Sequence, residues 1–234
     1  MIKTYNQIIQ NLKEENFTKI YLLMGEETFF INKISNFFEK NFISQEHRGF
    51  NLEIHYGRDS NIETIINSSK SFPMMSDKKL IIVKEGKDLD VFKSSNNSKI
   101  DLLINYLNNI NSTTTLVFCL NNKSLDKRSK LFKAFLEVST VLDSSSKENK
   151  VYDNQIPNFI SNEVKRNKFN IDEEATILLS ENIGNNLEKI DNALHKIFTN
   201  KDDKNIKTDD VIKLIGINRE YNLFEFQDSL VEKN

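Results

Sequence analysis

Apolar positions in the first 142 residues alternate between short continuous runs and stretches with helical spacing. Short apolar runs suit buried strands, whereas apolar residues three or four positions apart suit helices with one buried face. The runs predict strands at residues 20–24, 50–56, 80–83, 114–120 and 138–142. The helical spacing predicts helices at residues 29–38, 62–69, 100–110 and 126–136. This alternation predicts an α/β fold, with a mostly parallel sheet covered by helices on both faces.

The pattern changes after residue 142. Residues 143–150 read DSSSKENK, a polar stretch that is typical of an interdomain linker. Every later apolar pattern is helical, and Asp172 and Thr208 stand where helix caps are expected. We therefore expect a small all-helical second domain at residues 151–217. The predicted order is an α/β domain at 1–142, a linker at 143–150, a helical bundle at 151–217, and the start of a third domain at 218–234.

A strand, turn and helix near the start are built like a nucleotide-binding loop. A working P-loop reads G-x-x-x-x-G-K-[ST], whose backbone amides and lysine hold the phosphates and whose hydroxyl binds magnesium. The turn here reads Gly25, Glu26, Glu27, Thr28, and no lysine follows until Lys33. Two carboxylates thus stand where a polyphosphate would bring its own negative charge. We expect this degenerate loop to repel nucleotide.

A second notable segment is SFPMMSDKKLIIVK at residues 71–84. Pro73 is expected to end the preceding helix or to start a new turn, because it fixes its own backbone and disfavours helical angles at Phe72. Met74 and Met75 are adjacent and cannot easily face the same core. Flexible thioether side chains suit insertion into a partner's hydrophobic pocket. The alternative, favoured by composition alone, is that Phe72 and the two methionines pack under the sheet edge.

Composition and charge exclude several classes of protein. At 234 residues, with a formal net charge of -2 and a pI near 6.0, the chain has no global field that would attract nucleic acid or an anionic membrane. The single cysteine, Cys119, excludes an internal disulfide framework and is expected to be a buried small hydrophobe. With no signal-peptide core at its start and no apolar run that could span a bilayer, the chain is expected to be cytoplasmic.

Two further groups of residues give weaker signals. The histidines lack metal-ligand spacing, so surface or structural roles and no metal site are expected for His47, His55 and His195. A modest basic cluster could face DNA, although a solvated helix face is the favoured explanation for Lys123, Lys127, Arg128 and Lys130.

The ordered set of motifs carries more information than any one of them. The order YLLMGEE, FNLEIHYGRD, SFPMMSDKKLIIVKE resembles the delta subunit of the bacterial DNA polymerase III clamp loader. The later stretches IDEEATILLSENIGNNLEKIDNALHKI and IKTDDVIKLIGINREYNLFEFQDSL are similar to that family's helical second domain and the start of its third. The resemblance covers essentially the whole chain in colinear order.

The resemblance implies a RecA/AAA+-like sheet and a lid-like helical domain without ATPase chemistry. Consistent with this, the strand LIIVKE carries Lys84 where a magnesium-holding acid would stand. No catalytic residue, cofactor or intrinsic ATPase is expected, although the family forms part of the DNA polymerase holoenzyme. Carried over by position, the clamp contact falls on Phe72, Pro73, Met74 and Met75. The two methionines are expected to enter the clamp pocket on a short helix.

The resemblance also implies partners. They are the sliding clamp (beta subunit), whose ring the protein would help to open, the gamma/tau and delta prime subunits, and primed DNA within the assembled loader; no membrane is involved. Residues 218–234 would be only the start of the family's third, collar domain, so the chain is expected to bind a clamp without joining a stable loader. Two other classes stay open, namely an active P-loop-like NTPase and a nucleic-acid-binding adaptor without clamp contact.

Overall fold

The computed structural model describes residues 1–93 and 97–216. These form two compact units, of which the first is Met1–Lys150 and the second begins at Val151. The first unit contains, in order, α1 (Tyr5–Lys13), β1 (Ile20–Gly25), α2 (Thr28–Asn41), η1 (Gln45–His47), α3 (Arg48–Asn51), β2 (Leu52–Tyr56), α4 (Ile62–Lys70), β3 (Lys79–Lys84), η2 (Gly86–Asp88), α5 (Asp90–Lys93), α6 (Asn97–Asn108), β4 (Thr114–Asn121), α7 (Lys130–Val138) and β5 (Thr140–Asp143). No described helix is long and apolar enough to cross a membrane.

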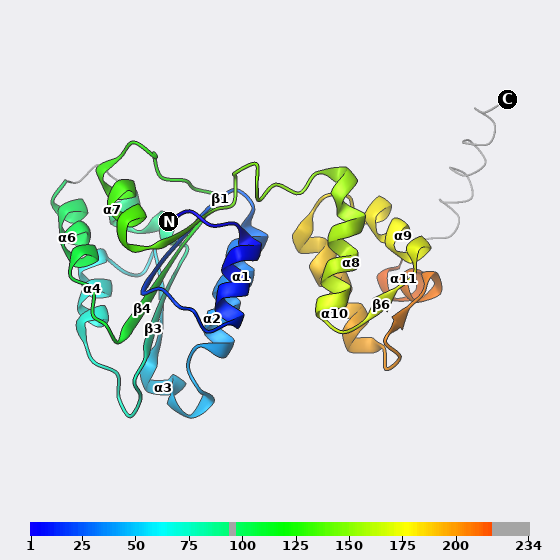
Figure 1. Cartoon of the computed structure of the whole chain (residues 1–234), viewed down its shortest axis with the longest axis horizontal. Coiled ribbons are helices and arrows are strands. Elements are labelled where there is room, and N and C mark those ends of the chain that lie inside the picture. The colour runs from blue at the N-terminus through cyan, green and yellow to red at the C-terminus, as the bar shows by residue number, and fades with distance from the viewer. Residues whose placement is uncertain (94–96, 217–234) are drawn as a thin grey trace. The chain divides into compact units, whose positions relative to one another are not determined.

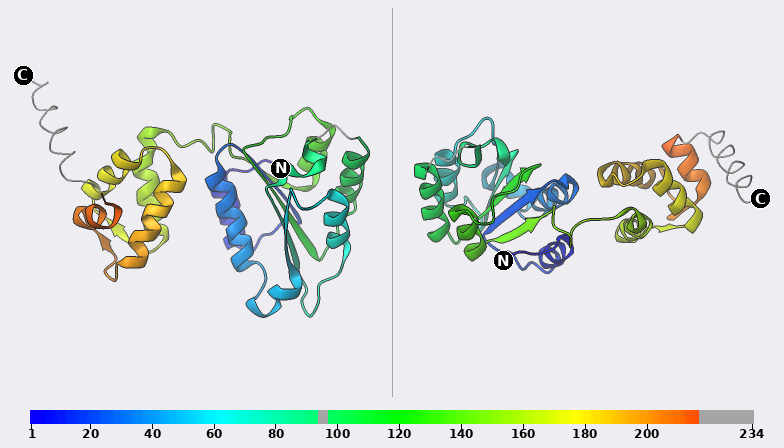
Figure 2. Two further views of the ribbon diagram at one scale, coloured as in Figure 1. Left: turned by 180° about the vertical axis from the view of Figure 1, so that it is seen from behind. Right: turned by 90° about the horizontal axis from the view of Figure 1, so that it is seen from above.

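The first unit is built on one parallel sheet. Its five strands lie in the order β2-β3-β4-β1-β5, and every neighbouring pair is parallel. Helices α4, α6 and α7 lie on one face of this sheet, and α1 and α2 lie on the other (Figure 1; Figure 2 gives two further views). The α/β fold with helices on both faces is therefore confirmed.

Both faces of β1 are buried, which explains its continuous apolar run. Side chains alternate between the two faces of a strand. Ile20, Leu22 and Met24 belong to the core cluster that includes residues of α4, α6 and α7. On the other face, the Tyr21 ring lies 4.7 Å from the Phe38 ring of α2, centroid to centroid, in an edge-on contact. The sheet is thus the middle layer of three.

Helix α1 was not among the predicted elements, although the sequence carries its signature. Thr4 and Gln7 form a capping box, in which each side chain accepts a hydrogen bond from the other residue's backbone amide. Tyr5, Ile8 and Leu12 then recur at helical spacing and are buried. The helical period of these three residues is the signal that predicts α1, and the expectations from the sequence did not include it.

The second strand begins later than its apolar run suggested. Residues 50 and 51, predicted to start the strand, belong instead to α3, and β2 begins at Leu52. Helix α7 also begins later, at Lys130, because the Ser129 hydroxyl caps it by accepting a hydrogen bond from the Phe132 amide at 3.1 Å. Both shifts are local, and the sheet order does not depend on them.

The segment 143–150, predicted to be a linker, is packed within the first unit. Asp143 ends β5, and the buried Asn149 side chain accepts a hydrogen bond from the Tyr5 amide at 2.8 Å. The Asn149 amide group also donates to the Asp143 carbonyl at 3.0 Å. Because the Asn149 side chain makes these contacts inside the first unit, residues 143–150 differ from an open linker.

The second unit is a helical bundle with one exception to the all-helical prediction. A two-residue parallel ladder joins residues 170–171 to residues 205–206. At the last of the described helices, Lys207 and not Thr208 occupies the N-cap position, and the Asp210 carboxylate accepts a hydrogen bond from the Lys207 amide at 2.8 Å. The elements are η3 (Asp153–Gln155), α8 (Ile156–Arg166), β6 (Asn170–Ile171), α9 (Glu173–Ile183), α10 (Leu187–Asn200), β7 (Asn205–Ile206) and α11 (Thr208–Ile215). The predicted third domain at 218–234 lies outside the described residues.

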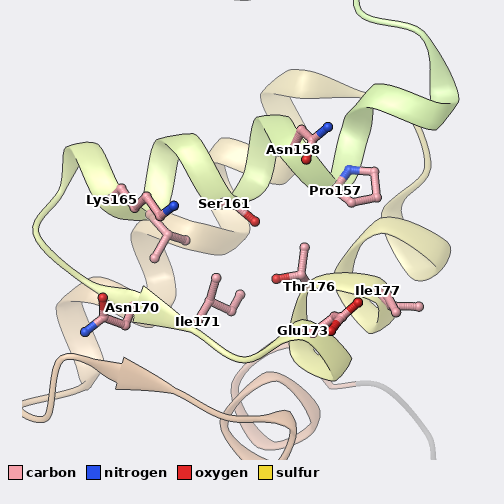
Figure 3. Close-up of a pocket in the computed structure, with 10 residues that line it drawn as sticks. Pro157, Asn158, Ser161, Lys165, Asn170, Ile171, Glu173, Thr176 and Ile177 are labelled. Carbon is pink, nitrogen blue, oxygen red and sulfur yellow. The ribbon is translucent and has the colours of Figure 1, made fainter.

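An open hollow of about 340 Å³ lies in this second unit, between α8, β6 and the start of α9 (Figure 3). Its walls mix apolar side chains with hydroxyl, amide and charged ones, and they include Lys165 and Glu173, which carry opposite charges. None of the site residues predicted from the sequence lines this hollow. The candidate functional residues lie in the first unit.

Candidate functional site

The loop at residues 71–78 exposes its apolar side chains. Phe72, Met74 and Met75 are 77%, 58% and 85% exposed, and Pro73 is half-buried. The alternative that these residues pack under the sheet edge is therefore wrong. The expected short helix is also absent from this described loop, because Pro73 disfavours helical angles before it and Met75 has a left-handed φ of 52°.

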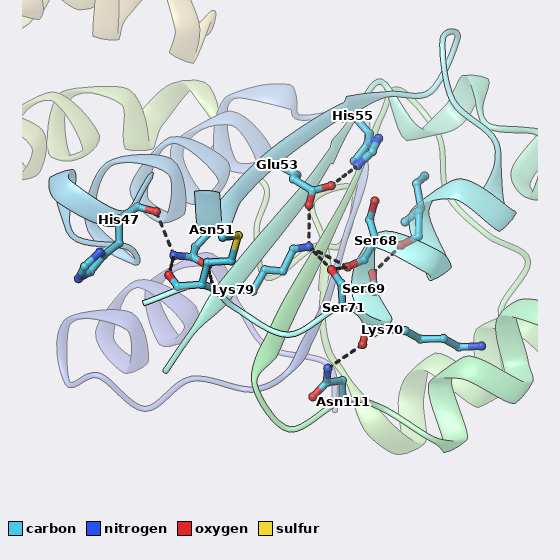
Figure 4. A network of polar contacts seen from close by, with 12 residues as sticks. His47, Asn51, Glu53, His55, Ser68, Ser69, Lys70, Ser71, Lys79 and Asn111 are labelled. Atoms are coloured by element: carbon cyan, nitrogen blue, oxygen red, sulfur yellow. Dashed lines mark hydrogen bonds and ion pairs between the residues drawn. The ribbon is translucent and has the colours of Figure 1, made fainter. Parts of the chain in front are cut away.

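A buried amide fixes the backbone of this exposed loop. Asn51, at the end of α3, is 0% exposed. Its side-chain oxygen accepts a hydrogen bond from the Met74 amide at 2.7 Å, and its side-chain nitrogen donates to the Met74 carbonyl at 2.7 Å and to the His47 carbonyl at 3.1 Å (Figure 4). Since both polar groups of one loop residue are held, the Met74 side chain is directed outward on a defined backbone.

A second anchor holds both ends of the loop. The buried Lys79 ammonium contacts the Glu53 carboxylate at 2.6 Å, the Ser68 carbonyl at 2.9 Å and the Ser71 hydroxyl at 2.5 Å (Figure 4). It thus ties the end of α4 to strands β2 and β3. Burial tends to raise the pKa of Glu53, but hydrogen bonds from Lys79 and neighbouring groups outweigh it and leave this pKa below its usual value.

The elements around the loop are tied to α2. The Arg48 guanidinium donates to the Ile43 carbonyl at 3.0 Å and also to the Lys40 carbonyl at the end of α2, which fixes the start of α3. On the other side of the loop, the Lys78 ammonium lies 5.5 Å from the centroids of the Phe17 and Phe42 rings. The loop is therefore held at its middle and its end by residues distant in sequence.

The two candidate sites lie at opposite ends of the parallel strands. The exposed loop precedes β3 and contacts α3, which precedes β2, so it lies at the amino ends of the parallel strands. The degenerate nucleotide loop follows β1 and lies at their carboxyl ends, where α/β sheets usually bind small ligands. The apolar loop is thus outside the usual position for a nucleotide or small substrate.

The turn after β1 is filled by the protein's own side chains. The Glu26 amide donates to the Ser145 hydroxyl at 2.8 Å, and the Phe29 amide donates to the Glu27 carboxylate at 3.2 Å. Glu27 is the N-cap of α2, and Thr28 is the first residue of that helix. A carboxylate of the chain therefore occupies the position where a helix amino end would hold a phosphate.

Gly25 allows the segment after β5 to approach this turn. Its φ is 123°, and a Cβ at this position would lie 2.4 Å from the Ser144 hydroxyl and 2.7 Å from the Ser145 amide nitrogen. At the end of β3, the Lys84 ammonium contacts the Glu39 carboxylate at 2.7 Å. The Lys33 ammonium lies 5.4 Å from the centroid of the Phe29 ring. These contacts support the expectation that the turn does not hold nucleotide.

The weaker candidate sites have structural roles. Cys119 is buried in β4, and burial raises the pKa of its thiol to about 12. His55 contacts Glu53 and Ser60, each at 3.2 Å. Three members of the basic cluster are paired with carboxylates, in the ion pairs Lys127–Asp143 (2.7 Å), Arg128–Asp126 (3.1 Å) and Lys130–Asp101 (2.8 Å). This pairing weakens the case for a DNA-binding face there.

Sequence reasoning found the exposed residues of the loop but missed those that hold it. The apolar pattern places Asn51 in the predicted strand at residues 50–56 and gives no role to Glu53 or Lys79. No local pattern identifies Asn51, because its partner Met74 is 23 positions away. Of the residues that hold the loop, Lys79 could have been identified from the sequence. A lysine directly before an apolar strand must either be exposed or pair with a carboxylate.

Comparison with known proteins identifies the family. Residues 21–145 match the family described as DNA polymerase III, delta subunit. DNA polymerase III subunit delta of Bacillus subtilis is 25% identical over 227 residues, which cover 96% of this chain and 64% of that protein. The chain thus spans less than two thirds of that relative.

A solved structure shows the same fold as this chain. The DNA clamp loader delta protein of Bacillus subtilis superposes with a TM-score of 0.70 at 23% identity, over 97% of this chain and 67% of that one. The Holliday junction branch migration motor RuvB of Thermotoga maritima is a more distant likeness, with a TM-score of 0.46 at 11% identity over 91% of this chain and 66% of that one. Because the family match covers more than half of the chain, the chain belongs to the DNA polymerase III delta subunit family.

Proposed function

We propose that this protein binds the sliding clamp through Phe72, Pro73, Met74 and Met75, and that this contact helps to open the clamp ring for loading onto primed DNA. The observation that carries the proposal is the loop itself, in which three large apolar side chains are exposed on a backbone that Asn51 and Lys79 fix. Exposed apolar groups that cluster on a monomer mark interaction sites. The fixed backbone reduces the ordering cost of binding.

The apolar area that the loop can bury limits the free energy of clamp binding. Complete burial of one methionine or phenylalanine side chain contributes roughly 1.5–3 kcal/mol, so Met74 and Met75 together contribute roughly 3–6 kcal/mol in gross terms. Binding shifts the clamp toward an open ring only by the difference in its affinity for the open and closed states. The methionines therefore supply attachment, and ring opening needs additional contacts that favour the open state.

The degenerate loop gives the protein a non-catalytic place in the proposed assembly. With Glu27 at the amino end of α2 and Ser145 on the Glu26 amide, the first unit has no free phosphate cradle at this turn. We therefore propose that this chain does not hydrolyse ATP in the loader, where the gamma/tau and delta prime subunits are its proposed partners. We also propose that this chain contacts primed DNA only within the assembled loader.

Calorimetric titration against the sliding clamp of the same organism tests the proposal. The parent chain is expected to bind, and the Met74→Ala, Met75→Ala double variant is expected to lose the binding while keeping the parent's unfolding free energy, because both side chains are exposed. Ile177→Ala, which truncates a 44% exposed side chain in the second unit, is the matched control. Absence of binding by the parent chain would overturn the proposal, and equal binding by the double variant would move the contact elsewhere.

A further inference from the structure

Exposed large apolar side chains are not spread evenly over the described part of the chain. Nine are exposed there, and three of these are the loop residues Phe72, Met74 and Met75. A fourth, Phe50, is 62% exposed and lies in α3, the helical turn that holds the loop. Single exposed apolar residues need no explanation, but several at one place on the surface do.

The anchor residue places Phe50 beside the loop. Asn51, the next residue in the chain, makes two hydrogen bonds of 2.7 Å to the Met74 backbone. Consecutive Cα atoms are about 3.8 Å apart, so Phe50 lies within one residue of the contact that fixes the loop. Strand β2 begins directly after this turn, at Leu52. Phe50 is thus, like the loop, at the amino ends of the parallel strands.

The turn that carries Phe50 is fixed as firmly as the loop. Arg48 binds the Ile43 carbonyl at 3.0 Å, and Asn51 donates to the His47 carbonyl at 3.1 Å. A large aromatic side chain on a fixed backbone contributes contact area and loses few rotatable bonds on binding. In the folded unit, however, more than half of the Phe50 surface is in water, which core packing does not explain.

We infer that Phe50 is a second contact residue for the sliding clamp, on a surface made by α3 together with the loop. This inference rests on the proposed clamp-binding function and extends it beyond residues 72–75. The occupant we assign is the clamp and not a second copy of this chain, because Phe50 directly precedes Asn51, which holds the Met74 backbone of the loop that we assign to the clamp. Asn51 acts as a positioning residue that joins the two parts of the surface.

The test compares two exposed aromatic side chains at opposite ends of β2. Phe50→Ala is expected to weaken clamp binding by about tenfold, because the variant loses the apolar area that a partly buried phenylalanine ring would contribute to the contact. Tyr56→Ala truncates a 45% exposed ring at the carboxyl end of the same strand and is expected to leave the affinity unchanged. Phe50→Leu, which keeps most of the apolar area, is expected to retain most of the affinity. Urea unfolding of each variant shows whether the fold is intact.

The outcomes separate this inference from the proposed function. If the parent chain does not bind the clamp, the proposed function fails, and this inference fails with it. If the parent binds and the Met74→Ala, Met75→Ala variant does not, but Phe50→Ala binds like the parent, only the inference about Phe50 is overturned. Sedimentation of the parent and Phe50→Ala at several concentrations covers the other occupant, because self-association that Phe50→Ala abolishes, with clamp affinity unchanged, would also overturn it.

Discussion

Substitution of Asn51 tests the proposed clamp contact, because this side chain holds the backbone of the exposed loop. Its effects on stability and on clamp affinity can be measured separately. Asn51→Ala removes three hydrogen bonds, of which two hold the Met74 backbone. A net contribution of about 0.5–1.5 kcal/mol for each bond gives a loss of roughly 1.5–4.5 kcal/mol in the free energy of unfolding. Because the loop is at the surface, water can replace part of what is lost, which places the expected loss toward the lower end.

The effect on clamp binding is expected to be separate and large. Without its anchor, the backbone around Met74 must be ordered when the clamp binds, at a cost of about 1–2 kcal/mol for each residue. Ordering two residues at that cost weakens binding by roughly thirtyfold or more. The anchored backbone should also exchange its amide hydrogens faster in the variant, in particular at Met74, whose amide donates to Asn51.

Three measurements test this reasoning. Urea unfolding gives the stability, calorimetry gives the clamp affinity, and hydrogen exchange reports on residues 71–78. Asn109→Ala is the matched control, because this exposed amide, directly after α6, donates to the Asn105 carbonyl of that helix and its loss is expected to change none of the three. An Asn51→Ala variant with parent-like stability, exchange and affinity would refute the role given to this residue.

The remaining predictions concern a carboxylate, a glycine and the cysteine. Lys79 lowers the pKa of Glu53, so the stability from this carboxylate is present above its usual pKa of 4.5 and lost as the pH falls through the lowered value. Glu53→Gln should therefore lose less stability than the parent between about pH 7 and pH 3 in urea titrations. Gly25→Ala should cost about 2–4 kcal/mol in urea unfolding, because φ is 123° and Ser144 leaves no room for a Cβ. Cys119 should react with a thiol reagent only in denaturant, because it is buried and its thiol pKa is about 12; reaction in the native state would contradict this burial.

Much of the fold could be predicted because its strands are buried on both faces. Continuous apolar runs such as IYLLM and LIIV have no other stable place than a covered sheet, so β1 and β3 were found with errors of one residue at each end at most. The short turn α3 could not be found this way. Its helical form depends on Arg48 and Asn51 bonding to groups elsewhere in the chain, while its sequence continues the apolar pattern of the strand.

In the candidate site too, features with a local sequence pattern could be predicted, and those that depend on tertiary contacts could not. Exposure of the methionines could be proposed from their adjacency to each other and to Pro73, although composition alone favoured burial and the resemblance to a known family decided between the two. Their anchors could not, because Asn51 and Lys79 act through tertiary contacts with Met74 and Glu53. Repulsion of nucleotide by the degenerate loop could be predicted from its carboxylates, but the hydrogen bond between Ser145 and the Glu26 amide joins positions 119 residues apart and has no local signal.

A fluorescent probe on the loop would test the proposed contact most directly. Because Cys119 is buried, a Met75→Cys variant can be labelled at position 75 with an environment-sensitive dye, and Tyr56→Cys gives the matched control at the opposite edge of the sheet. If the loop enters an apolar pocket, adding the sliding clamp should shift the emission of the Met75→Cys label to the blue and leave the Tyr56→Cys label unchanged. Clamp binding by calorimetry with no change in the emission at position 75 would contradict the account.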